Sequence, residues 1–258
     1  MIGAITQVRM KSTRMPGKAM KEVMGRPLLG YLVERLRACK YLDDIIIATT
    51  VNREDDIIAD YAGKENLPFF RGSEHDVLSR YYETAREFGV KHVVRISSDC
   101  PLVDPVLVDR AIANYLDGGY DYVHLSPAFA EGLDTEVFSF RALETAHQKA
   151  KWKSEREHVT LYLNNNLELF NKLVIDNETD DSTYRFTVDE PEDFEVVKAI
   201  FEALYEKDAR PFGFEAVKSF LDAHPEIAQK NAHVIRNEGL LISLRKDTII
   251  GKRDTQIQ

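Results

Sequence analysis

A dense group of cations directly follows the first apolar segment of the chain. Residues 2 to 8 read "IGAITQV", a pattern typical of a buried strand. The next ten residues, 9 to 18, are called the basic loop here, and they contain Arg9, Lys11, Ser12, Arg14 and Lys18. Guanidinium and ammonium groups, hydroxyls and free backbone N–H groups are the donors that match triphosphate oxygens. The spacing therefore predicts a phosphate-binding loop, and a solubilising positive patch is the alternative.

The charge of the whole chain makes this concentration of cations local. The 258 residues contain 34 Lys and Arg against 43 Asp and Glu, for a formal net charge of −9. The segment matches neither the dinucleotide G-x-G-x-x-G pattern nor the G-x-x-x-x-G-K-[ST] phosphate loop. General nucleic-acid binding needs a broad basic face, so we expect no nucleic-acid partner.

Two aspartates end apolar segments that are predicted to be strands. Asp99 follows "VVRISS" and Asp189 follows "YRFTV". Carboxyl ends of parallel strands meet at one edge of a sheet, and Mg²⁺ binds one or two carboxylates together with phosphate oxygens and water. The pair therefore suits a metal–nucleotide site. Asp189 also stands two residues before Pro191, so capping of the following helix is an equal alternative for it.

The length and composition indicate an ordinary α/β protein. A chain of 258 residues can form one large domain or a domain with an added lobe. No apolar run reaches the roughly 18 residues of a membrane span, and no signal core follows the N-terminus, so we expect a cytosolic protein without a membrane partner. Cys39 and Cys100 lack metal-ligand spacing and are expected to be reduced, packed thiols. No role is assigned to the isolated histidines His92, His124 and His147.

Strand-like and helix-like segments alternate through the first 125 residues. Strands are predicted at residues 2–8, 44–50, 67–72 and 92–98. Helices are predicted at residues 27–40, 54–66, 75–89 and 105–119, because apolar residues recur there at helical spacing. This alternation predicts a mostly parallel, Rossmann-like sheet with helices on both faces. Ligands bind such sheets beyond the carboxyl ends of the strands.

The pattern changes after residue 125. Strands are predicted at 133–140, 170–176 and 184–189, with helices at 141–150 and 155–166. We expect residues 126–186 to form an inserted small mixed lobe that caps the site or carries a dimer contact. A helix is predicted from Pro191, because proline and acidic residues occupy its first turn. The main domain is expected to span 1–225, and residues 226–258 are expected to form a helix and a loosely held tail.

The basic loop resembles the signature of a known family. "QVRMKSTRMPGK" is similar to the Q-A-R-M-G-S-T-R-L-P-G-K motif of the cytidylyltransferases that include the spore-coat polysaccharide protein SpsF and CMP-sugar synthetases for 2-keto-3-deoxyoctonate and sialic-like acids. Further similar blocks follow in the same order: "IIIATTVNREDD", "FFRGSEHDVLSRYY", "VRISSDCPLVDP", "GLDTEVFSF", "SEREHVT", "RFTVDEPEDFE" and "RNEGLLISL". The resemblance covers nearly the whole chain and is closest to the SpsF-like branch.

The resemblance implies a fold, a reaction and partners. The fold is that of nucleotide-diphospho-sugar transferases, also called GT-A-like. The reaction is a CTP- and Mg²⁺-dependent transfer of CMP to the hydroxyl of a sugar, such as a 2-keto sugar acid, with release of pyrophosphate. A homodimer formed through residues 126–186 is also implied. Arg14, Lys18 and Asp99 are the implied catalytic residues.

The resemblance also implies three groups of binding residues. The triphosphate would be bound by Arg9, Ser12, Arg14 and Lys18, and the base and ribose by Ala48, Thr49, Thr50, Arg71, Ser73 and Asp76. Gln7 is a further implied nucleotide-binding residue. The metal would be bound by Asp99 and Asp189. The sugar would be bound by Glu131, Asp134, Glu155, Arg156, His158 and Arg185. Each of these sugar-binding roles has an ordinary structural alternative. Glu155, Arg156 and His158 could lie on a solvated helix face, Glu131 and Asp134 could shape a turn, and Arg185 could be a strand-edge charge.

Lys11 departs from the family pattern, because it stands where the motif has glycine. Either the loop conformation does not need glycine there, or nucleotide binding is altered. Two other functions are considered. A glycosyltransferase would be expected to carry a D-x-D motif, whereas this chain has D-x-x-x-x-D at Asp99 and Asp104. A non-catalytic partner in polysaccharide assembly is the second alternative.

Overall fold

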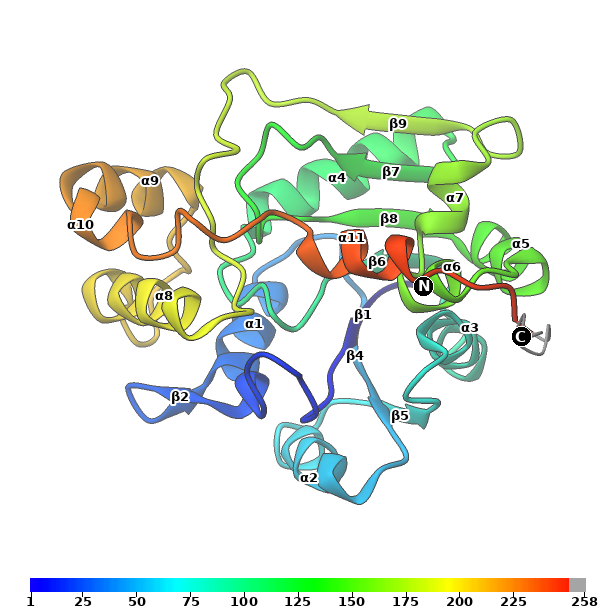
Figure 1. Cartoon of the computed structure of the whole chain (residues 1–258), viewed down its shortest axis with the longest axis horizontal. Helices are drawn as coiled ribbons and strands as arrows, with labels where there is room; N and C mark the ends of the chain where they lie inside the picture. The colour runs from blue at the N-terminus through cyan, green and yellow to red at the C-terminus, as the bar shows by residue number, and fades with distance from the viewer. Residues whose placement is uncertain (251–258) are drawn as a thin grey trace, which may run out of the picture.

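A seven-stranded sheet forms the centre of the computed structural model, which describes residues 1–250 (Figure 1). Across the sheet the strands are β5 (Phe69–Gly72), β4 (Asp44–Thr50), β1 (Ile2–Gln7), β6 (His92–Arg95), β8 (Glu136–Ser139), β7 (Tyr122–Leu125) and β9 (Lys172–Ile175). β8 runs antiparallel to β6 and β7, and the other neighbouring pairs are parallel. The predicted mostly parallel α/β fold is confirmed.

Helices connect these strands and cover both faces. They are α1 (Leu28–Arg37), α2 (Asp56–Lys64), α3 (Val77–Glu87), α4 (Pro105–Gly118), α5 (Phe140–Lys149), α6 (Lys153–Glu157), α7 (Leu161–Asn165), α8 (Pro191–Leu204), α9 (Phe214–Ala223), α10 (Pro225–Ala228) and α11 (Glu238–Arg245). Short 3₁₀ helices span Lys18–Met20 and Arg53–Asp55, and a two-stranded hairpin pairs β2 (Glu22–Val23) with β3 (Arg26–Pro27).

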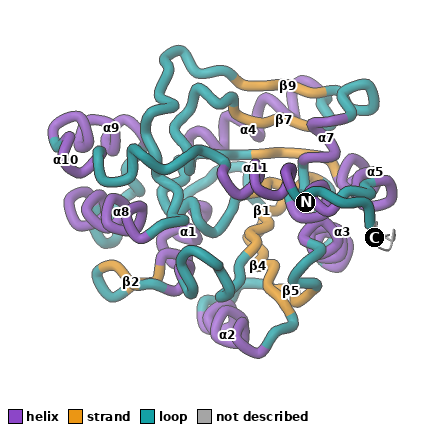
Figure 2. The backbone as a smooth tube through the Cα atoms, viewed as in Figure 1, coloured by secondary structure: helices purple, strands orange, loops and turns teal. Residues whose placement is uncertain are grey.

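Alternate residues of the strands pack into different cores. Ala4 of β1 lies in a cluster with α1, α2 and α4, whereas Ile5 lies in a second cluster with α3 and α5. This alternation follows from the two-residue period of a strand. A third cluster joins α8 and α9 to the other side of α1, where Tyr31 stacks on Phe201 with 4.0 Å between ring centroids. Figure 2 shows α8 and α9 grouped at one end of the molecule.

The segment after residue 125 differs from its expected arrangement. Its strands β8 and β9 join the central sheet and do not form a separate small sheet, because Val137 and Phe138 are buried on opposite faces beside β6. Residues 184–189 are not part of the sheet, and there Arg185 forms only an isolated bridge with Glu131. The helix expected at 155–166 is two helices, α6 and α7, because Val159 adopts a left-handed φ of 34°.

The chain end crosses the front of the sheet. α11 lies over the middle strands in Figure 1. The following residues are bonded to the start of α6: Lys153 N–H donates to the Thr248 carbonyl at 3.0 Å, and Ile250 N–H donates to the Lys151 carbonyl at 2.8 Å. The tail is therefore held as far as residue 250, and residues 251–258 lie outside the described part. No helix within residues 1–250 is long and apolar enough to span a membrane.

Gly132 is predicted to be required by its backbone conformation. Its φ is 102°, and a Cβ atom there would lie 2.5 Å from the Thr187 backbone nitrogen. Gly132→Ala should lower the free energy of unfolding by about 1–3 kcal/mol, measured by urea denaturation. Gly63→Ala is the matched control, because Gly63 lies in α2 and a Cβ atom there would meet no other atom within 4 Å. This control should raise stability by about 0.5–1 kcal/mol. Equal midpoints for Gly132→Ala and the unchanged protein would contradict the conformational requirement.

Candidate active site

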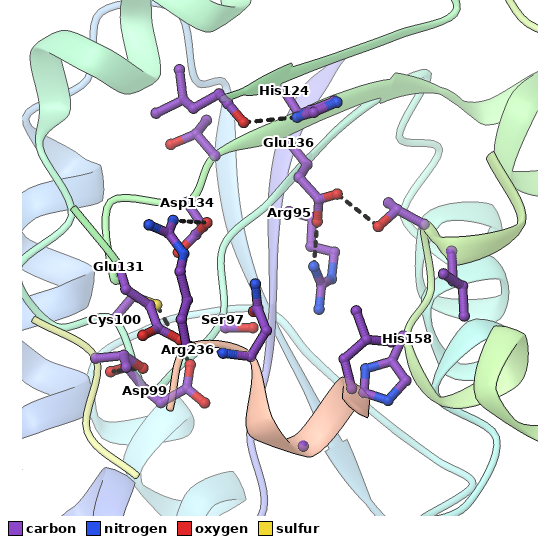
Figure 3. A pocket seen from close by; sticks show the side chains of 18 of the residues that line it. Arg95, Ser97, Asp99, Cys100, His124, Glu131, Asp134, Glu136, His158 and Arg236 are labelled. Atoms are coloured by element: carbon purple, nitrogen blue, oxygen red, sulfur yellow. Dashed lines mark hydrogen bonds and ion pairs between the residues drawn. The ribbon is translucent and has the colours of Figure 1, made fainter. Parts of the chain in front are cut away.

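Two adjoining cavities open at the carboxyl edge of the sheet. One, of about 400 Å³, is lined by the basic loop and is called the loop cavity. The other, of about 420 Å³, lies over β7 and β8 and is called the inner cavity (Figure 3). Residues of α11 line both cavities, and both share Gln7, Ser97, Asp99, His158 and Asp189. The two cavities therefore meet at the ends of β1 and β6.

The basic loop is closed by its own backbone. Gly17 N–H donates to the Met10 carbonyl at 2.8 Å, and Gly17 takes a left-handed φ of 72°. Met10 N–H donates to Asp55 at 2.7 Å. Lys11 has no left-handed φ, and its side chain is 65% exposed and forms an ion pair with Glu74 at 3.6 Å. The loop conformation does not require glycine at position 11.

Lys18 lies between the two aspartates. Its Nζ atom is 3.1 Å from Asp99 Oδ2 and 2.7 Å from Asp189 Oδ1, and it also donates to the Val188 carbonyl at 2.8 Å. Burial alone would lower the pKa of Lys18, but the two carboxylates outweigh it and raise that pKa. Burial alone would raise the pKa of Asp189, but Lys18 and Arg14 outweigh it and lower that pKa. The lysine and Asp189 are therefore both charged at neutral pH.

Asp189 does not cap the following helix. The N-cap of α8 is Glu190, which forms a capping box with Asp193. Asp193 accepts from the backbone N–H groups of Asp189 and Glu190, each at 2.9 Å. The Asp189 carboxylate instead accepts from Lys18 and, at 3.0 Å, forms an ion pair with Arg14. The capping alternative for Asp189 is therefore wrong.

The carboxylate pair fits a magnesium ion whose remaining ligands are phosphate oxygens or water. Within residues 1–250 no group of three or more His, Cys, Asp or Glu side chains converges as a metal site. Asp99 and Asp189 nevertheless converge on one cation, the Lys18 ammonium. Mg²⁺ accepts one or two protein carboxylates when phosphate oxygens and water supply its other ligands. Asp104 is not available as a further ligand, because it caps α4 and accepts from Phe214 N–H at 2.7 Å.

Arg14 joins the basic loop to the chain end. Its guanidinium forms ion pairs with Glu190 at 3.2 Å and with Glu238 of α11 at 3.1 Å, in addition to Asp189. Arg9 is more exposed and pairs with Glu74 at 3.6 Å. The Ser12 hydroxyl accepts from Met15 N–H at 3.3 Å. All three side chains line the loop cavity.

The residues expected to bind base and ribose lie outside both cavities. Arg71 donates to the carbonyls of Thr50 and Asn52 and pairs with Asp56 at 2.7 Å. Asp76 caps α3, accepting from Ser79 N–H at 2.8 Å. The others at this end of β4 and β5 are Ala48, Thr49 and Ser73, and none of them lines either cavity. These polar groups organise the strand ends and α3.

The residues expected to bind sugar are divided between the inner cavity and the interior. Glu131, Asp134 and His158 line the inner cavity (Figure 3). Arg185 is buried and forms ion pairs with Glu131 and Asp193, so it faces protein groups. Arg156 binds Asp76 with both Nε and Nη2. Glu155 accepts from Trp152 N–H at 3.1 Å at the start of α6.

Several lining residues were not predicted from the sequence. Arg95 and Glu136 form an ion pair in the inner cavity, and Arg236 approaches Asp134 at 3.7 Å (Figure 3). A charged residue inside the buried strand "HVVR" was an available signal for Arg95. Arg80 of α3 lines the loop cavity. It was hidden because one charged residue in an amphipathic helix pattern is ordinary.

The sheet is Rossmann-like, and a cationic loop and two carboxylates lie at its carboxyl edge. This combination is typical of nucleotide-binding α/β proteins. A family model for cytidylyltransferases matches residues 3–238. The spore coat polysaccharide biosynthesis protein SpsF of Bacillus subtilis is 33% identical over 210 residues, which cover 79% of this chain and 87% of SpsF.

Solved structures agree with this match. A cytidylyltransferase from Leptospira borgpetersenii is 31% identical with a TM-score of 0.83, covering 88% of this chain and 96% of that chain. A CMP:2-keto-3-deoxy-manno-octonic acid synthetase complexed with CTP is 14% identical with a TM-score of 0.61, covering 79% and 99%, and shares the fold. The chain belongs to the cytidylyltransferase family, and its enzymatic activity is that of a CTP-using nucleotidyltransferase.

Lys18→Met should expose the repulsion between the two aspartates. Loss of the shared ammonium should lower the free energy of unfolding by about 1.5–3 kcal/mol. Millimolar Mg²⁺ should raise the melting temperature of the variant more than that of the unchanged protein, because the ion replaces the missing cation.

Two controls make this result specific. Lys91→Met removes an exposed lysine before β6 and should leave both the stability and its Mg²⁺ response unchanged. NaCl at matched ionic strength separates ion binding from screening. An equal Mg²⁺ response in Lys18→Met and the unchanged protein would argue against this carboxylate pair as an ion site.

Proposed function

We propose that the protein transfers CMP from CTP to a sugar hydroxyl and produces a CMP-sugar and pyrophosphate for surface polysaccharide or glycan biosynthesis. The observation that carries this proposal is the meeting of Lys18, Asp99 and Asp189 where the two cavities join. The loop cavity binds CTP, as the related synthetase does, and the inner cavity binds the sugar. We propose the cytosol as the compartment, because Cys39 and Cys100 are free thiols.

The proposed reaction is a substitution at the α-phosphorus. The sugar oxygen forms a bond to the α-phosphorus while the bond from the α-phosphorus to the pyrophosphate oxygen breaks. The hydroxyl proton leaves to solvent or to a phosphate oxygen. Catalysis of such transfers consists mainly of positioning and charge neutralisation. Arg14 and Lys18 exchange their carboxylate partners for phosphate oxygens and stabilise the negative charge that develops on pyrophosphate.

We propose that Asp99 and Asp189 hold Mg²⁺ when CTP is bound. The ion supplies neutralisation of the phosphate charge and polarisation of a phosphate oxygen. With Lys18 moved to the phosphates, the two carboxylates need another cation between them. This requirement links metal binding to nucleotide binding.

The inner cavity favours an acidic, polyhydroxylated sugar. Arg95 and Arg236 each have a buried Nε without a partner among the described residues, and guanidinium groups suit a sugar carboxylate. His124 and His158 each have a buried Nε2 without such a partner. Burial lowers the pKa of both histidines, so neutral imidazoles are available to sugar hydroxyls. These features support a 2-keto sugar acid as the acceptor.

A pyrophosphate-release assay tests the function. The purified protein is incubated with Mg²⁺, each of the four nucleoside triphosphates, and a panel of 2-keto sugar acids and neutral sugars. Release is expected with CTP and a 2-keto sugar acid. CTP should also raise the melting temperature most, because a ligand that binds only the native state stabilises it more the more tightly it binds. Equal thermal shifts from all four nucleotides would contradict cytidine selection. Release with neutral sugars but not with 2-keto sugar acids would contradict the assignment of a sugar acid as the acceptor.

Asp99→Asn distinguishes metal binding from structure. Turnover should fall by roughly 10²–10³, as when one preorganised electrostatic contact is lost, while CTP affinity without Mg²⁺ should change little. Asp104→Asn is the control, because Asp104 is the cap of α4; it should lower stability by about 1 kcal/mol and keep near-normal turnover. Near-normal turnover in Asp99→Asn would refute its metal role.

We further propose that two chains associate through the 126–186 segment. β9 is an edge strand of the sheet, and exposed apolar side chains lie on or near it: Leu167, Leu169 and Val174. Exposed apolar edges favour pairing with another chain. Light scattering should give about twice the chain mass of 29.5 kDa. Val174→Lys should reduce this to the chain mass, whereas Val51→Lys, at another exposed valine, should not. A monomeric mass for the unchanged protein at micromolar concentration would contradict the proposal.

A further inference from the structure

Residues 236–250 form a strap that lies over the two cavities (Figure 1). The middle of the strap is α11, which lines both cavities. None of the eight residues of α11 is buried, although the helix contains Leu240, Leu241, Ile242 and Leu244. A helix without a buried apolar face contributes little to the hydrophobic core. Polar contacts at a few points therefore hold α11 in place.

The strap is attached at both of its ends. At its start, Arg236 donates to the carbonyls of Pro127 and Phe129, each at 2.8 Å. Near its end, Ser154 N–H donates to Asp247 at 3.0 Å. The middle of the strap can therefore move while the chain end stays attached.

Glu238 joins the middle of the strap to the basic loop. Its Oε2 atom accepts from Arg14 Nη1 at 3.1 Å, and within residues 1–250 Arg14 is the one side chain that pairs with it. The Glu238 side chain is 37% exposed and that of Arg14 is 29% exposed, and both line the inner cavity. A ligand in the cavities can therefore reach both members of this pair.

Carboxylates outnumber cations around Arg14. The connected group contains two cations and four carboxylates: Arg14, Lys18, Asp99, Asp189, Glu190 and Glu238. A triphosphate brings further negative charge to this group, and like charges at such distances repel one another. Its binding is therefore favoured when one carboxylate moves away from Arg14.

Glu238 is the carboxylate that is free to move. The backbone N–H groups of Asp189 and Glu190 each donate to the buried Asp193 at 2.9 Å, which fixes both residues. Glu238 instead lies on a helix without buried residues. We infer that Glu238 is an internal competitor of the nucleotide: in the free enzyme its carboxylate occupies the place of a phosphate oxygen on Arg14, and a bound triphosphate takes Arg14 and releases α11 from the basic loop. The inference rests on the proposed function, since it takes Arg14 as a triphosphate ligand.

Calorimetry with inorganic tripolyphosphate, without added Mg²⁺, tests the competition. Glu238→Gln should bind tripolyphosphate about two- to fivefold more tightly than the unchanged protein, because a partly exposed ion pair no longer has to be broken. Glu157→Gln is the matched control, since Glu157 lines the loop cavity and glutamine keeps an acceptor for the Ser243 hydroxyl. At about 0.15 M salt this control should change the affinity less than about 1.5-fold, because exposed charges are screened.

Hydrogen exchange of the α11 amides, followed by mass spectrometry, tests the release. Tripolyphosphate should speed this exchange about two- to fivefold in the unchanged protein, because local opening becomes easier once the ion pair is lost. In Glu238→Gln the exchange should already be fast and should not respond to tripolyphosphate. Ser243→Ala removes the contact between α11 and Glu157, so it should speed the exchange while tripolyphosphate affinity stays unchanged.

Three results would overturn the inference. Equal or weaker tripolyphosphate binding by Glu238→Gln would show that Glu238 does not compete for Arg14. Slower exchange of α11 with tripolyphosphate would show that the strap closes over the ligand. Absence of tripolyphosphate binding to the unchanged protein would remove Arg14 as a phosphate ligand, and the inference with it. The proposed function fails separately, if the release assay gives no pyrophosphate while tripolyphosphate binds and releases α11.

Discussion

The buried ion pair between Arg185 and Asp193 determines where the site residues lie. Asp193 is fully buried and accepts from Arg185 Nε at 2.8 Å and from Asn231 at 2.9 Å, in addition to the two N–H groups before α8. Burial alone would raise the pKa of Asp193, but Arg185 and the backbone N–H groups of Glu190 and Asp189 outweigh it and lower that pKa. Arg185 also binds Glu131, whose other oxygen accepts from Asn237 N–H at 3.0 Å, beside α11. Removing one member of such a pair typically costs about 3–5 kcal/mol, because a charge is left buried and unpaired.

The cations of the site are held in place before any nucleotide arrives. Lys18 and Arg14 bind carboxylates of Asp99, Asp189 and Glu238. The raised pKa of Lys18 makes its stabilisation complete below its ordinary pKa of 10.5 and lost only at more alkaline pH. The lowered pKa of Asp189 makes its stabilisation present above its ordinary pKa of 3.8 and lost on acidification. In the proposed reaction, nucleotide binding near neutral pH replaces these carboxylates by phosphate oxygens around cations that are already ordered.

Sequence patterns predicted those features that depend on chain order alone. Strand and helix alternation predicted the sheet. Asp99 and Asp189 converge as predicted, as their shared contact to Lys18 shows, although the segment 184–189 before Asp189 is not a strand of the sheet. The partners of single charged residues were not predictable. Asp76 and Arg156 are 80 residues apart and bind each other, so neither was recognisable as a structural pair. The break at Val159 was also hidden, because β-branched residues rarely adopt a positive φ and no glycine or proline marks the position.

The placement of α11 has a consequence for the order in which the molecule is completed. The contact between Arg14 and Glu238 joins residues 224 positions apart in the chain. Contacts this distant in sequence form late, because a long loop must close before they are gained. During synthesis the sheet and its helices leave the ribosome before α11 does, so the central domain can fold while both cavities are still open to solvent on that side. Both cavities are thus completed by a helix that emerges after the whole of the central sheet.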